Sequence, residues 1–148
     1  MAIPVVVGRS RARRGALQAA YQWQLGGGGS VAIRSQFRER EGMDKVDWVY
    51  FDALVEGVID QQQVLDDLLT PHLDRPIEQV DPVEQAILRI ATLELKDHPE
   101  VPFRVAINEA VELARRFGAE QSHRYVNGVL DALARTLRPQ ETGPAPRR

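Results

Sequence analysis

The residues of this chain whose type and spacing best suit a chemical task are arginines near its start, and the task is the binding of a polyanion. Four of them fall within six residues: Arg9, Arg11, Arg13 and Arg14. Residues 1–38 hold six arginines and no acidic side chain, whereas the rest of the chain holds 13 basic and 21 acidic side chains. Such a cluster in an otherwise acidic chain indicates a polyanion site, with nucleic acid as the expected ligand. The alternative is a basic segment that is merely solvated.

Residue combinations that would support catalysis or bind a metal are missing from the sequence. The three histidines are 25 or 26 residues apart and form no ligand motif. Ser122 and His123 are neighbours, but adjacent helical side chains diverge by about 100° and cannot act as nucleophile and base. The absence of cysteine excludes disulfides, thiolate metal sites and a cysteine nucleophile. We therefore predict a noncatalytic binding module with no metal and no cofactor.

Length and composition are those of an ordinary globular domain. The chain has 148 residues, of which 43% are hydrophobic and 27% charged, enough to bury a core in one domain. No segment approaches the roughly 20 apolar residues that a membrane-spanning helix needs. The first residues lack the charged and apolar regions of a signal peptide. Together with the lack of cysteine, these features predict a cytoplasmic protein without a membrane partner.

Hydrophobic periodicity predicts helices almost throughout, and hence an all-α fold. The glycine run 26–29 ends the first helix, because four glycines lose too much backbone entropy to stay helical. The expected helices cover 9–25, 30–41 and 44–69; a fourth begins at Pro82, a fifth ends at Phe117, and a last one, capped by Ser122, ends at 137. The predicted organisation is a flexible N-terminus over 1–8, a helical domain over 9–137 and a disordered, Pro-rich tail over 138–148.

The helix that begins at Pro82 has the clearest start signal in the chain. Asp81 suits the N-cap, Pro82 the first helical position, and Glu84 the capping-box position three residues after the cap. Apolar residues follow on two faces, so this helix is either central to the fold or also meets a partner. Its predicted polar face consists of Gln85, Arg89, Thr92 and Lys96.

Five segments of the sequence are more specific than helical periodicity requires, and the last ends in the string Val-Asn-Gly-Val-Leu-Asp at 126–131. They lie at 9–13, 20–25, 86–91, 101–114 and 117–131. In this order the segments resemble the NusB family of transcription antitermination factors, over residues 9–138. The resemblance implies an all-α, NusB-like fold of two small helical bundles in one compact domain, and a noncatalytic role.

The resemblance also implies an RNA-binding site made of two groups of side chains. Proteins that recognise single-stranded RNA stack bases on aromatic or guanidinium planes and hold phosphates with cations. Tyr125 lies beside the apolar stripe of its helix, so an ordinary core tyrosine is the alternative. Asn127 and Gly128, inside the same helix, indicate close packing or a close approach to the backbone, and a purely structural reason is favoured over a functional one. The implied RNA-binding residues are Arg9, Arg11, Arg13, Arg14, Arg124 and Tyr125.

For a protein partner the resemblance points to Tyr21 and Glu84. Each has a structural alternative: Glu84 occupies the capping-box position, and Tyr21 suits a hydrophobic core. The implied function is the binding of boxA-type single-stranded RNA together with NusE, a small-subunit ribosomal protein. The pair acts in an RNA polymerase complex with NusA and NusG that suppresses termination and supports ribosomal RNA transcription.

Two other functions remain open from the sequence. The same helical module resembles the N-terminal domain of a ribosomal RNA cytosine methyltransferase, which favours a role in ribosomal RNA maturation. A self-associating module is the second alternative, because a helix apolar on two faces would permit a homodimer.

Overall fold

The computed structural model describes residues 3–143, and within them every regular element is helical. The predicted all-α fold is therefore confirmed. The chain divides after Gln62 into two compact units, residues 1–62 and 63–148, each with its own set of packed helices. These units match the two small helical bundles that the family resemblance implies.

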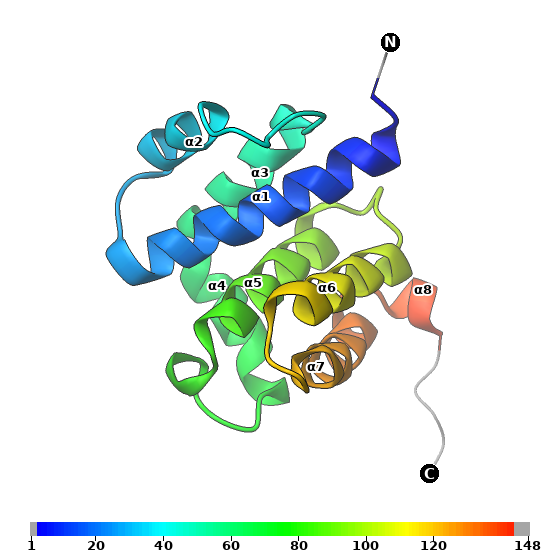
Figure 1. Ribbon diagram of the computed structural model, residues 1–148. Helices are drawn as coiled ribbons and strands as arrows, with labels where there is room; N and C mark the ends of the chain where they lie inside the picture. Colours follow the sequence, from blue (N-terminus) through cyan, green and yellow to red (C-terminus); the bar gives the residue numbers. More distant parts are fainter. Residues whose placement is uncertain (1–2, 144–148) are drawn as a thin grey trace. The chain divides into compact units, whose positions relative to one another are not determined.

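The first unit is built from three helices (Figure 1), α1 (Val5–Gly26), α2 (Ser30–Arg38) and α3 (Trp48–Asp60). α1 packs along α3, and α2 contacts both. Small residues allow the close approach of α1 and α3. A Cβ added at Gly15 would lie 3.3 Å from the Phe51 ring and 2.9 Å from Met43, so only glycine fits there without a shift. The Phe37 and Phe51 rings fill the space between α2 and α3, with centroids 6.0 Å apart.

Several helix boundaries differ from the sequence prediction, and α2 ends at Arg38 rather than at residue 41. α1 begins at Val5, four residues before the predicted start, because Pro4 occupies the N-cap and three valines continue the helix. The predicted helix over 44–69 is two helices, with the backbone interrupted at Gln61. The first begins only at Trp48, since the Asp47 side chain accepts a hydrogen bond from the Tyr50 N–H at 3.0 Å and caps α3 there.

The second unit contains α4 (Gln62–Leu69), α5 (Pro82–Asp97), α6 (Phe103–Phe117), α7 (Ser122–Leu137) and the short α8 (Pro139–Thr142). Two 3₁₀ turns, Thr70–His72 and Ile77–Gln79, lie between α4 and α5. α5, α6 and α7 pack against one another pairwise, and α8 packs on α7. The largest buried side chains of these helices are Leu65, Leu69, Ile87, Leu88, Leu93, Leu95, Leu130 and Leu133.

The start of α5 is confirmed, but its predicted polar face is only partly exposed: Lys96 is exposed and Gln85 half-buried, whereas Arg89 and Thr92 are buried. The Asp81 side chain accepts hydrogen bonds from the N–H groups of Val83 and Glu84, as an N-cap does. Every residue of α5 from Ala86 to Leu95 is buried. Arg89 tolerates this burial because its guanidinium forms a bidentate pair with Asp66 of α4, at 2.8 and 3.0 Å.

The segment that follows α7 is held by Arg138, which is 8% exposed. Its guanidinium donates to the carbonyl oxygens of Leu95, Val101 and His98 at 2.7–3.0 Å, and it pairs with Glu141 of α8. A cation here satisfies carbonyls that the end of α5 leaves without helical partners. Residues 138–143 are thus part of the packed structure, in contrast to the predicted disordered tail over 138–148. Residues 144–148 of that prediction, and residues 1–2 of the predicted flexible N-terminus, lie outside the described residues.

Candidate nucleic-acid interface

The four clustered arginines lie on α1 in the first unit and differ in what they contact. Arg9 and Arg13 are one turn apart, and their guanidinium groups lie 4.5 and 5.5 Å from the centre of the Tyr50 ring. Arg13 is buried, with 3% of its surface exposed, whereas Arg9, Arg11 and Arg14 are half-buried. Arg13 therefore has a structural role against Tyr50, and the other three present most of the cationic surface of the cluster.

Part of the positive charge of the first 38 residues is neutralised within the first unit. Arg34 lies 3.8 Å from Asp52 and 3.6 Å from Glu56, and Arg38 shares the Asp52 carboxylate. These pairs tie α2 to α3. Arg11 lies 4.0 Å from Asp44, an exposed pair that salt screens readily. The charge asymmetry of the sequence therefore overstates the net positive charge around α1 and α2.

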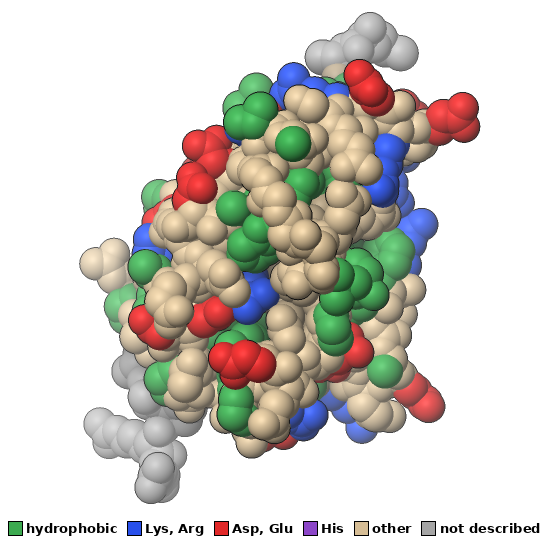
Figure 2. Space-filling view, turned by 90° about the vertical axis from the view of Figure 1, so that its left-hand side faces the viewer, with side chains coloured by type: hydrophobic (Ala, Val, Ile, Leu, Met, Phe, Trp, Pro, Cys, Tyr) green, Lys and Arg blue, Asp and Glu red, His purple; other side chains and the backbone are tan. Residues whose placement is uncertain are grey.

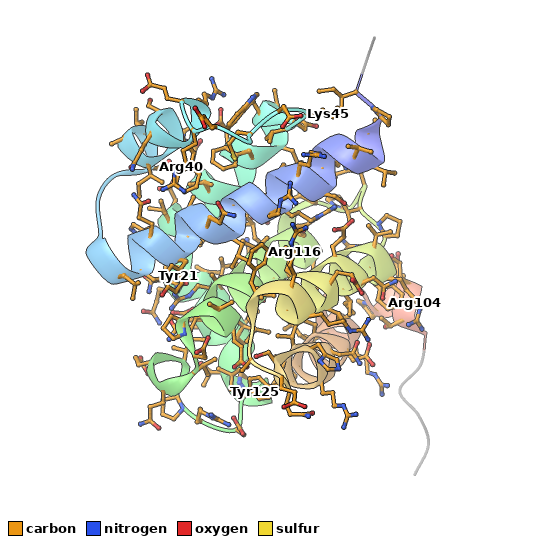
Figure 3. All side chains as sticks on the ribbon, in the orientation of Figure 1. Tyr21, Arg40, Lys45, Arg104, Arg116 and Tyr125 are labelled. Atoms are coloured by element: carbon orange, nitrogen blue, oxygen red, sulfur yellow. The ribbon has the colours of Figure 1, made fainter. Side chains whose placement is uncertain are left out.

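Tyr125 is half-buried on α7 in the second unit, and it belongs to a polar cluster at the edge of that unit (Figure 3). Its hydroxyl donates to Asp74 Oδ1 at 3.0 Å, and the Arg75 guanidinium lies 5.6 Å from the centre of its ring. Arg75 also donates to both Asp74 oxygens, at 2.8 and 2.7 Å. The buried apolar residues of α7 are others: Val126, Val129, Leu130 and Leu133. Tyr125 is therefore not an ordinary core tyrosine.

Asp74 stays ionised in this cluster. Hydrogen bonds from Arg75, and to a lesser extent from the Tyr125 hydroxyl, lower the pKa of Asp74 from 3.8 to about 2, although desolvation opposes the change. Since this pKa is depressed in the folded state, the stabilisation is present above pH 3.8 and is lost as the pH falls toward 2. Burial raises the pKa of Tyr125, as does its bond to Asp74, so the phenol is neutral at pH 7.

The exposed face of α7 continues from this cluster. Arg124, Asn127 and Gly128 are all exposed. A Cβ added at Gly128 would meet no atom within 4 Å. Close packing, one of the two explanations expected for Asn127 and Gly128, is therefore wrong for Gly128, because no neighbour among residues 3–143 requires a glycine at that position.

The two residues implied for protein binding are both accessible, and they belong to different units. Tyr21 lies on α1 and is 38% exposed, so it is not a core residue (Figure 3). Glu84 is half-buried at the start of α5, where its Oε1 accepts a hydrogen bond from the Ser122 hydroxyl at 2.6 Å. Ser122 does not cap α7 as predicted, since the N-cap residue is Gln121. Glu84 thus joins the starts of α5 and α7 within the second unit.

Sequence reasoning missed Asp74 and Arg75, which lie in the loop between the two 3₁₀ turns. An Asp-Arg-Pro run is typical of an ordinary turn, and Asp74 is 51 residues from Tyr125, so no local pattern indicates their contact. The same loop lines a cavity of about 420 Å³ with mixed charge, whose charged lining residues are Asp66, Asp67, Asp74, Arg75 and Glu78.

Over residues 3–143, no group of three or more His, Asp or Glu side chains is placed to hold a metal ion. No helix in the same range is long and apolar enough to cross a membrane. On the face drawn in Figure 2, acidic and basic side chains are interspersed in small groups among polar and hydrophobic ones.

Comparison with known proteins places this arrangement in a family. The profile described as the NusB family matches residues 10–135. The transcription antitermination protein NusB of Xanthomonas campestris pv. campestris (strain B100) is 51% identical over 135 residues, which cover 91% of this chain and 85% of the relative. The protein of the same name from Stenotrophomonas maltophilia (strain R551-3) is 50% identical with the same coverage.

Solved structures agree with the fold. T. maritima NusB superposes with a TM-score of 0.78 at 28% identity, covering 96% of this chain and 98% of that one. The antitermination factor NusB in a crystal structure with NusE and dsRNA has a TM-score of 0.76 at 24% identity, covering 86% and 96% of the two chains. With a family profile that spans most of its length and relatives about half identical to it, the chain belongs to the NusB family.

Proposed function

We propose that this protein is a noncatalytic transcription antitermination factor that binds boxA-type single-stranded RNA. The observation that carries the proposal is the cluster of Tyr125, Asp74 and Arg75. Its partly exposed aromatic ring has one guanidinium against it and a second, that of Arg124, on the preceding residue. An aromatic face beside cations is the arrangement with which proteins hold unpaired bases and their phosphates.

The proposal includes a complex with NusE, acting in the cytoplasm on RNA polymerase with NusA and NusG to support ribosomal RNA transcription. Three observations support it: the antitermination name of the curated relatives, the crystal structure in which a NusB is bound to NusE and dsRNA, and the accessibility of Tyr21 and Glu84. The maturation alternative draws no support from these names.

The cationic surface of α1 is expected to supply the salt-dependent part of RNA affinity. Replacing Arg11 and Arg14 with Gln should weaken binding and flatten its dependence on salt, by about 0.7 in the log–log slope for each phosphate that is no longer neutralised. The double variant should therefore bind with a slope that is about 1.4 units shallower, measured by fluorescence anisotropy at several salt concentrations. Arg13 is left intact because it is buried against Tyr50.

The matched control for this prediction is a double variant of exposed arginines in the second unit, Arg115→Gln with Arg135→Gln. It makes the same change in net charge on α6 and α7, which belong to the other unit. If the salt dependence of RNA affinity has the same slope in the Arg11/Arg14 variant as in the control, the arginines of α1 are merely solvated and do not contact RNA phosphates.

Reversing the charge of Glu84 is expected to weaken the binding of NusE. Glu84→Lys removes the acceptor for the Ser122 hydroxyl and places a cation at the start of α5, so a loss of stability of about 0.5–2 kcal/mol accompanies it. Calorimetric titration with NusE measures the partner contact, and thermal unfolding measures the stability change separately. Glu78→Lys, at an exposed site of the same unit, is the control. A folded Glu84→Lys protein with the parent affinity for NusE would contradict the contact.

The sequence suggests a homodimer because α5 is apolar on two faces. Both faces are buried within the folded chain, so this reason for a homodimer no longer applies. Sedimentation at several protein concentrations, with and without NusE, distinguishes a self-associating protein from one that forms only the heterodimer.

A further inference from the structure

Gly128 is a costly residue at its position in α7. It lies within the helix Ser122–Leu137, several residues from either end, where glycine is less stable than alanine because it gives up more backbone freedom on folding. A glycine inside a helix is normally found where a side chain would clash with a neighbour or where the backbone adopts an unusual conformation.

Neither need arises from the chain itself. Gly15 and Gly118 are required by their surroundings, since an added Cβ would lie 2.9 Å and 2.7 Å from neighbouring atoms. At Gly128 the same Cβ would meet nothing within 4 Å, and the residue is exposed in a helical conformation. Residues 3–143 therefore give no internal reason for a glycine at this position.

The residues around Gly128 indicate what approaches. Side chains three and four positions apart in a helix are neighbours on its surface, which places Tyr125 and Arg124 on the same face as Gly128. Asn127, the preceding residue in the chain, is exposed and offers an amide. The Arg75 guanidinium lies against the Tyr125 ring and is held there by Asp74. A bare stretch of helix beside cations and an aromatic ring suits a nucleic-acid strand rather than an apolar protein surface.

We propose that Gly128 forms a notch on α7 through which the sugar–phosphate backbone of single-stranded RNA passes against the helix, next to a base stacked on Tyr125. The inference rests on the proposed function and adds to it the path of the strand and a residue that sets it. Any side chain at position 128 would hold the strand away from the helix and pull the neighbouring base off the ring.

The test uses Gly128→Ala and Gly128→Leu in the full-length chain, with NusE present and a fluorescent boxA-type RNA as the probe. Both variants should unfold at a higher temperature than the parent, since the added side chain meets no atom and favours the helix. Both should bind the RNA more weakly, by about fivefold or more for Leu, the lower end of what losing one base–aromatic stack costs. If the variants are more stable than the parent but bind RNA more weakly, the loss of binding cannot come from a folding defect and supports the notch.

Gly26→Ala is the matched control, because Gly26 also lies in a helix with no atom within 4 Å of an added Cβ. It should leave RNA affinity unchanged. Parent-like RNA affinity in both Gly128 variants would overturn the notch while leaving the proposed function intact. If the Gly128 variants bind NusE more weakly but bind RNA as the parent does, the notch is wrong and Gly128 contacts the protein partner instead. Failure of the parent protein to bind the RNA would overturn the proposed function and the notch together.

Discussion

Replacing Arg138 with Met is expected to destabilise the protein by about 2–6 kcal/mol, because two buried carbonyl groups lose their donor at roughly 1–3 kcal/mol each. The variant leaves the carbonyls of the buried residues Leu95 and Val101 without their Arg138 donor, and a methionine supplies no hydrogen bond in return. Urea unfolding followed by circular dichroism measures the change as a shift of the midpoint.

Arg135→Met makes the same chemical change at an exposed site of α7 and is the control for Arg138. Its effect should stay within about 0.5 kcal/mol, as for most surface substitutions. If the Arg138 variant unfolds at the same urea concentration as the Arg135 variant, the hydrogen bonds of Arg138 do not stabilise the packing of α5.

Tyr125→Ala is expected to cost about 1–3 kcal/mol of RNA binding, the range for one base–aromatic stack. Tyr125→Phe should keep most of the affinity, because the ring stacks and the substitution removes only the hydroxyl bond to Asp74. Since Tyr125 is half-buried, the Ala variant should lose less stability than the roughly 3–5 kcal/mol typical of a fully buried aromatic ring. RNA titration and urea unfolding of the same two variants give both quantities.

The control for Tyr125 is a scrambled RNA of equal length and composition, which the arginines should still hold to some degree. Tyr125→Ala should reduce the difference between the two RNAs. A strongly destabilised Ala variant whose folded fraction binds boxA-type RNA as the parent does would contradict a stacking role.

The sequence predicts the helices best where local chemistry marks their ends. The start of α5 follows from Asp81 and Pro82, which take the cap and first helical positions in the structure. The break at Gln61 escapes prediction because Leu65 follows Val58 at helical spacing and residues 60–63 contain neither glycine nor proline. From the sequence, Arg89 and Arg138 would be expected at the surface. Their burial depends on distant partners: the Asp66 carboxylate, 23 residues from Arg89, and backbone carbonyls 37–44 residues from Arg138.

The candidate site is predictable only in part, for the same reason. Arg124 and Tyr125 follow from a sequence motif, and the structure leaves both accessible. Asp74 and Arg75 reach Tyr125 only through the fold of the second unit. The packing role predicted for Gly128 is wrong because a sequence gives no measure of open space.

The central claim is that this chain recognises boxA-type RNA together with NusE, and one titration tests it most directly. Labelled boxA-type RNA and its scrambled counterpart are titrated with the protein alone and with the protein plus NusE, at fixed salt. We expect boxA-type RNA to bind more tightly than the scrambled RNA and NusE to widen the difference. Equal affinity for the two RNAs in the presence of NusE would contradict it, and would leave the protein a nonspecific binder of polyanions.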